Sequence, residues 1–116
     1  MSCYRIVLAE KARTAAGLLS GGQQQMVILS CATIRSPRVL LLDEPSLGLA
    51  PIIVRQIYAF ITDFARASGA TVVIAEQMAT VALKAADHGF ALRRGRVVLA
   101  GTSAELLGGG LAATYL

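Results

Sequence analysis

Four consecutive aliphatic residues, Val39 to Leu42, followed by Asp43 and Glu44, restrict the folding of this chain more than any other feature. An uninterrupted aliphatic run has no polar face, so it is typical of a parallel strand that is buried on both faces. A second run, Thr71–Ala75, is rich in β-branched residues and also predicts a buried strand.

A helix is predicted before the first strand, over Gly21–Ile34. The hydroxyl of Ser20 can cap the amide three residues further on, and Gln23 completes a capping box. Pro37 ends this helix, because a proline disfavours the helical conformation in the residue before it.

A second helix is predicted between the two strands. Pro51 suits the first helical position of a segment that runs to about Ala67, and Ser68 and Gly69 end it. Its apolar residues form one stripe, which consists of Ile53, Ile57, Phe60, Ile61 and Phe64. The order strand, helix, strand predicts a right-handed βαβ unit, and therefore an α/β fold with a parallel core.

The remaining chain is predicted to form a short helix, a hairpin and a terminal helix. The short helix covers Ala79–Ala86, and a turn with a glycine joins the hairpin strands Phe90–Arg93 and Arg96–Leu99. Thr102 and Glu105 form a second capping box, at the start of the terminal helix.

Length and composition limit the class of protein. A chain of 116 residues is the usual size of one domain, so one core is expected, and an apolar fraction of 55% excludes disorder. The apolar stretches are shorter than the roughly 18 residues of a membrane-spanning helix, and the first residues do not resemble a secretory signal. We therefore expect a cytoplasmic protein with no transmembrane segment of its own.

The net charge of +4 raises the possibility of a nucleic-acid partner. Only Arg93, Arg94 and Arg96 cluster, and no aromatic residues lie among them to stack on bases. No nucleic-acid partner is expected.

Polar residues follow both predicted strands. Asp43 and Glu44 end the first strand, and Glu76 and Gln77 end the second. Ligands of parallel sheets bind at the carboxyl ends of the strands, where Mg²⁺ would compensate two adjacent carboxylates. The alternative is that Asp-Glu-Pro only ends a strand and begins a turn.

Three elements in this order resemble ABC-type ATPases. Leu19–Gln23 resembles their signature motif, and Val39–Glu44 resembles their Walker B strand with its catalytic glutamate. Residues 45–51 and Ala75–Gln77 resemble the subfamily that energises the import of branched-chain amino acids, the LivF-like subunits. The resemblance extends from about Leu8 to Leu116.

The resemblance implies the carboxyl-terminal part of one P-loop NTPase domain, with a parallel sheet flanked by helices and a C-terminal β-hairpin. Within residues 1–116 it implies a signature helix over 20–36, a Walker B strand over 38–44, a switch strand over 71–77, and a hairpin with a final helix over 89–116.

The resemblance also implies a site that two subunits share. Ser20, Gly21, Gly22 and Gln23 would contact ATP that the opposite subunit of a head-to-tail dimer holds. That second ABC ATPase subunit could be identical or different. Membrane permease subunits would be further partners, which places the protein on the inner face of the plasma membrane.

The same resemblance assigns the catalytic groups. Asp43 would support Mg²⁺ through water, and Glu44 would polarise the water that attacks the terminal phosphate. Gln77 takes the position at which most of these ATPases have a switch histidine, and Ala50 takes that of a loop aspartate. The lone His88 is not expected to replace the switch histidine.

A Walker A loop requires Gly-Lys before Ser or Thr, and the sequence has no Gly-Lys pair. The Walker A half of the domain is therefore expected to be absent, and the isolated chain is expected neither to hold nor to hydrolyse ATP. The interpretation is an importer ATPase subunit present as a fragment. The alternatives are a non-catalytic gene remnant, a separately encoded half, or the ATPase of a related amide or urea importer.

Overall fold

The computed structural model describes residues 9–108. The chain divides into two compact units, Met1–Ala75 and Glu76–Leu116. Each unit buries apolar residues of its own. Met26, Leu29, Ile57 and Ile61 form the core cluster of the first unit. Leu83 and Leu106 are buried in the second.

The first unit consists of a short 3₁₀ turn, two helices and two strands. In chain order these are η1 (Ala16–Leu18), α2 (Gly21–Thr33), β1 (Val39–Asp43), α3 (Pro51–Ser68) and β2 (Thr71–Ala75).

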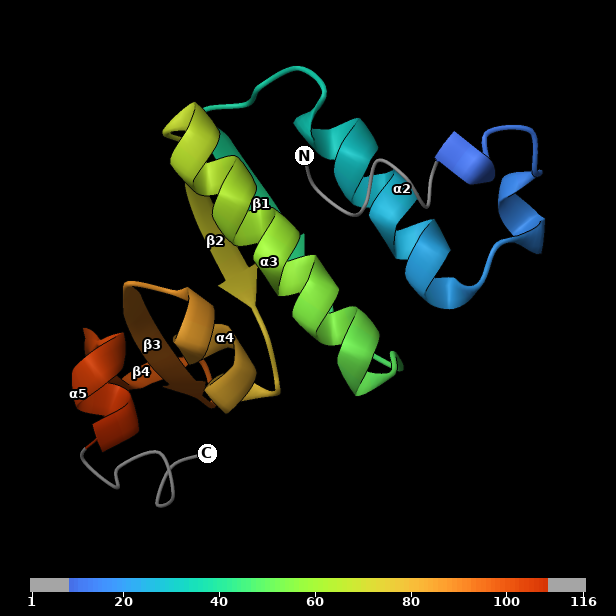
Figure 1. Cartoon of the computed structure of the whole chain (residues 1–116). Helices are drawn as coiled ribbons and strands as arrows, with labels where there is room; N and C mark the ends of the chain where they lie inside the picture. Colours follow the sequence, from blue (N-terminus) through green and yellow to red (C-terminus); the bar gives the residue numbers. More distant parts are fainter. Residues whose placement is uncertain (1–8, 109–116) are drawn as a thin grey trace. The chain divides into compact units, whose positions relative to one another are not determined.

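The strands β1 and β2 pair in parallel, from Val39 opposite Thr71 to Asp43 opposite Ala75. They are joined through α3, so the predicted parallel α/β arrangement is confirmed. Figure 1 shows that α3 runs along one face of the two strands. The carboxyl ends of β1 and β2 point to the same end of this unit as the N-terminal ends of α2 and α3.

Only one face of this strand pair is covered. Leu42, Val72 and Ile74 pack on the core cluster, and Leu40 is also buried. Val39, Leu41 and Val73, on the opposite face, are each more than half exposed. The prediction of burial on both faces is therefore wrong for residues 9–108, because α3 covers one side.

The helix α2 is shorter than the predicted range 20–36. Ser20 is its N-cap, Ile34 is its C-cap, and Ser36 has a φ of 48° directly before Pro37. A left-handed residue cannot continue a right-handed helix, so the helix ends before the proline. The strand predicted over 38–44 is likewise Val39–Asp43.

The helix α3 begins and ends as the sequence predicts. Pro51 is its first residue, and Gly69 caps its end with a φ of 68°, donating its N–H to the Ala65 carbonyl. The predicted stripe faces the core, because Ile57 and Ile61 are buried and Ile53 packs on them.

The second unit consists of α4 (Ala79–Ala85), β3 (His88–Arg93), β4 (Arg96–Thr102) and α5 (Ser103–Gly108). The hairpin pairs antiparallel, and its turn residues Arg94 and Gly95 both have positive φ, which suits a two-residue turn. It begins at His88 and not at residue 89. The part of the predicted range 89–116 beyond residue 108 lies outside the described residues.

No helix within residues 9–108 has the length and apolar character needed to cross a membrane.

Leu40 and Leu41 are adjacent but lie on opposite faces of β1, at 6% and 72% exposed. We expect Leu40→Ala to lower the free energy of unfolding by about 2–4 kcal/mol, because it leaves a cavity under α3. Leu41→Ala should change it by less than about 0.5 kcal/mol, because its side chain is already in solvent. Urea denaturation measures both values, and equal losses would contradict the one-sided core.

The capping box of α5 makes this helix sensitive to acid. The N–H and then the hydroxyl of Thr102, each 2.8 Å from Glu105 Oε2, lower the pKa of Glu105 below 4.5, with a smaller contribution from His88. Because the pKa of Glu105 is lower in the folded state, its ionised form stabilises that state at pH values above the ordinary pKa of 4.5. This stabilisation is lost as the pH falls through the lowered pKa.

Glu105→Gln should therefore remove the acid transition of α5 that we expect of the wild-type chain below the usual pKa of a glutamate. NMR signals of residues 102–106, followed during an acid titration, report this transition. Glu10→Gln serves as the control, since Glu10 is exposed and lies in the other unit. A transition that persists in Glu105→Gln would disprove the assignment.

Candidate functional site

The N-terminal end of α2 has the predicted capping box. The Gln23 N–H donates to Ser20 Oγ at 3.3 Å, and the Ser20 N–H donates to Gln23 Oε1 at 3.0 Å. The first helical hydrogen bond runs from the Gln24 N–H to the Ser20 carbonyl at 2.9 Å. The N–H groups of Gly21 and Gly22 precede this bond and point out of the helix end.

This end of the helix has the chemistry of an anion site. The helix dipole places partial positive charge there, and Ser20 and Gly21 are exposed. The Ser20 hydroxyl accepts from the Gln23 N–H, so its own hydrogen is available to donate to a ligand. Gln23 Oε1 is held by the capping box, which leaves Nε2 as the side-chain donor of Gln23.

The two carboxylates lie at the end of β1. Asp43 is opposite Ala75, and the Glu44 N–H donates to the Ala75 carbonyl at 2.8 Å, which extends the pairing by one residue. Glu44 has a φ of 45°, in the left-handed region. Both side chains are exposed, so the sheet fixes their backbone while their carboxylates remain in solvent.

The loop after Glu44 is tightly held. Pro45 and Ser46 are fully buried, the Leu47 N–H donates to the Glu44 carbonyl at 3.1 Å, and the Leu49 N–H donates to the Ser46 carbonyl at 3.2 Å. The expected turn is thus present, but it does more than end a strand. It joins the carboxylates to α3 through a short segment with little freedom.

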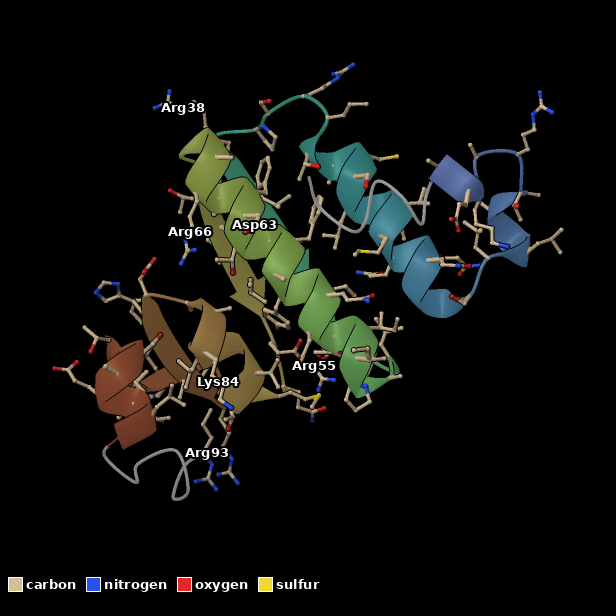
Figure 2. The ribbon with its side chains drawn as sticks, in the orientation of Figure 1. Arg38, Arg55, Asp63, Arg66, Lys84 and Arg93 are labelled. Atoms are coloured by element: carbon tan, nitrogen blue, oxygen red, sulfur yellow. The ribbon has the colours of Figure 1, made fainter. Side chains whose placement is uncertain are left out.

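The N-cap of α3 is Ala50. Its carbonyl accepts the N–H groups of Ile53 and Val54, but its side chain makes no cap. A cation also lies near this end of the helix, because Arg55 is exposed in the second turn of α3 (Figure 2).

The sequence did not predict the contacts that the two glycines make. A Cβ atom at Gly21 would lie 3.6 Å from Leu49 Cδ2, and one at Gly22 would lie 2.6 Å from Ile53 Cγ2. The loop and α3 therefore touch the first turn of α2. A glycine pair at a helix start is the only sequence signal of such an approach.

Gln77 belongs to the second unit, Glu76–Leu116. It follows Glu76, whose Oε1 accepts the N–H groups of Gln77 and Met78 at 2.9 and 3.2 Å. The Gln77 side chain is exposed, and so is His88 at the start of β3.

The carboxylates of Asp43 and Glu44 fit Mg²⁺. Mg²⁺ prefers one or two carboxylates, with water and phosphate oxygens as its other ligands. Within residues 9–108 no group of three or more His, Cys, Asp or Glu residues could hold a metal ion. Two carboxylates supply part of such a shell, and water and phosphate oxygens would supply the rest.

Comparison with known proteins agrees with this arrangement. The model of the ABC transporter family matches residues 4–47, a range that contains the capped helix start and both carboxylates. The chain is 49% identical over 100 residues to the high-affinity branched-chain amino acid transport ATP-binding protein BraG of Pseudomonas aeruginosa, covering 86% of this chain and 42% of BraG. The chain is thus similar to ABC transporter ATP-binding proteins, and residues 4–47 match the model of the ABC transporter family.

Two further comparisons give similar matches. The chain is 38% identical over 111 residues to the phosphonates import ATP-binding protein PhnC of Thiobacillus denitrificans, covering 96% of this chain and 43% of PhnC. The ADP conformation of an ATP-binding cassette of an ABC transporter matches with a TM-score of 0.75 and 26% identity, over 88% of this chain and 41% of that one.

A nucleotide-free ATP-binding cassette from an ABC transporter matches with a TM-score of 0.78 and 25% identity, over 94% of this chain and 45% of that one. The predicted α/β cassette fold is thus confirmed at this level. The chain spans less than half the length of these relatives.

The left-handed backbone at Glu44 predicts opposite effects of glycine and of valine at this position on stability. A left-handed conformation costs a residue with a Cβ atom roughly 1–2 kcal/mol. Glu44→Gly should therefore leave the free energy of unfolding unchanged or raise it by up to about 1 kcal/mol, whereas Glu44→Val should lower it by about 1–2 kcal/mol.

Urea denaturation measures both changes, and Glu44→Gln is the matched control that keeps the Cβ atom and removes the charge. Equal destabilisation by Gly and Val would show that the φ of Glu44 stores no strain.

Proposed function

We propose that this chain supplies the signature segment and the Walker B carboxylates of an ATP-hydrolysing subunit of an importer for branched-chain amino acids. The observation that carries the proposal is the arrangement of the first unit. It joins a capped helix start with outward amides to two solvent-facing carboxylates through the buried turn at Pro45 and Ser46.

In this proposal the start of α2 binds a phosphate of ATP that a partner subunit holds. Gly21 and Gly22 donate their backbone N–H groups, Ser20 donates its hydroxyl, and Gln23 donates through Nε2. A head-to-tail dimer places each signature segment on the other subunit's nucleotide. These 116 residues contain no Gly-Lys pair, so they supply no Walker A lysine.

The signature segment serves the ATP of the partner subunit, whereas Asp43 and Glu44 serve the ATP site on their own subunit's side of the dimer. Asp43 would hold Mg²⁺ through water, and this ion would neutralise phosphate charge when bound. Glu44 orients the attacking water and accepts its proton, for which an exposed carboxylate on a fixed backbone is suited. Gln77 donates a hydrogen bond to the terminal phosphate without adding positive charge.

The names of two relatives support the choice of solute. BraG is named for branched-chain amino acid transport and PhnC for phosphonate import, and the higher identity to BraG favours branched-chain amino acids. Permease subunits on the inner face of the plasma membrane would complete the transporter, with the ATPase on the cytoplasmic side.

The test uses the 116-residue chain together with purified BraG whose own signature serine has been replaced by arginine. The chain alone should show no ATP turnover. Added to the defective BraG, it should raise Mg-dependent hydrolysis by about tenfold or more, because loss of a transition-state contact typically costs about 100-fold.

Ser20→Arg should abolish this increase, because the side chain fills the phosphate position. Ala32→Arg is the matched control, since it adds the same charge at an exposed position near the other end of α2 and should keep the increase. No increase with the wild-type chain would contradict the proposed function. Membrane vesicles that contain the permease then test the solute, by uptake of labelled leucine against a phosphonate and urea.

A further inference from the structure

Gly22 occupies a notch that only a residue without a side chain can fill. It is buried in the first turn of α2. A Cβ atom there would lie 2.6 Å from Cγ2 of Ile53, 3.2 Å from its Cγ1 and 3.4 Å from its Cβ. Carbon atoms do not approach to 2.6 Å, so any larger residue would force α2 or Ile53 to move.

Ile53 is poorly able to move. A β-branched side chain in a helix has one strongly preferred χ1 rotamer, and Cγ2 branches directly from its Cβ. Ile53 also packs against the core cluster of Met26, Leu29, Ile57 and Ile61. A larger residue in the notch would therefore displace the start of α2 away from α3.

The loop supports the same turn of α2 from a neighbouring position. Leu49 Cδ2 would lie in ordinary van der Waals contact with a Cβ at Gly21, and Leu49 packs on the core cluster. Ile53 is tied to this loop, because its N–H donates to the Ala50 carbonyl at 2.9 Å. The start of α2 thus rests on the segment that leads directly back to Glu44.

We propose that Ile53 is a positioning residue for the signature segment. Its contact with Gly22 fixes the outward N–H groups of the first turn of α2 relative to the loop that follows Asp43 and Glu44. The two functional parts of the first unit are therefore held in one geometry by a contact between a glycine and a branched side chain. The identity of the ligand that these amides bind rests on the proposed function, whereas the contact between Gly22 and Ile53 does not.

The first experiment compares Ile53→Val with Ile53→Ala by ¹⁵N NMR. Valine keeps both γ carbons, so the amide signals of Ser20 and Gly21 should stay where they are. Alanine removes Cγ2 from the notch, so the same signals should shift or broaden. A residue that served packing alone would lower the melting temperature without moving these two signals, and identical Ser20 and Gly21 signals in both variants would overturn the proposal.

The second experiment fills the notch and then reopens it. Gly22→Ala should move the Ser20 and Gly21 signals, and the double variant Gly22→Ala with Ile53→Ala should return them towards the wild type. Gly17→Ala is the matched control, because a Cβ atom there meets nothing within 4 Å and it should change neither signal. A double variant no closer to the wild type than Gly22→Ala would contradict the proposal.

The assay with defective BraG separates this inference from the proposed function. With Gly22→Ala the increase in hydrolysis should be smaller by about tenfold or more, since a displacement of roughly 1 Å can lower a rate about 100-fold. The double variant should restore most of the increase. If the wild-type chain gives no increase, the proposed function is wrong, and the NMR comparisons still decide the role of Ile53. If the wild type gives an increase that Gly22→Ala retains, the positioning role is wrong.

Discussion

The parallel pairing of β1 with β2 is the constraint on which the rest of the first unit depends. Its ladder runs to Asp43 and continues through the Glu44 N–H to the Ala75 carbonyl, so it fixes where both carboxylates leave the sheet. Parallel strands require a crossover, and α3 provides it while burying Leu40 and packing on Leu42. The first turn of α2 also packs on the first turn of α3, where Gly22 meets Ile53.

Glu44 is one of three non-glycine residues with a positive φ among those that the structure describes, with Ser36 and Arg94. Glu44 is in the left-handed region, and the two residues after it are fully buried. Burial of Pro45 and Ser46 holds the turn in place, so the strain at Glu44 is sustained by its neighbours and not by its own side chain. The Glu44 side chain is thus exposed on a backbone that the Ala75 carbonyl and the buried turn hold.

Much of this unit could be predicted from the sequence because its signals are local. The capping box of Ser20 and Gln23, Pro51 at a helix start and Gly69 at a helix end each depend on neighbouring residues. The aliphatic run gave the strand but not its burial, because burial depends on how many layers cover it. The notch between Gly22 and Ile53 could not be predicted, since it joins residues from two helices whose approach only the folded chain defines.

The division into two compact units could not be predicted from the sequence either. The hydrophobic pattern locates each strand but not its partners, and within residues 9–108 the hairpin strands pair with each other in a sheet separate from β1 and β2. The order of elements along the chain is the same for one core or two. The difference lies in strand pairing, which local patterns do not encode.

The donors proposed for phosphate are all neutral. Backbone N–H groups at Gly21 and Gly22, the Ser20 hydroxyl and the Gln77 amide do not change protonation near neutral pH. A switch histidine at position 77 would add charge to the phosphate contact as pH falls, and glutamine cannot. The phosphate contacts of this chain should therefore depend on geometry, and geometry is what the close packing of α2 on α3 provides.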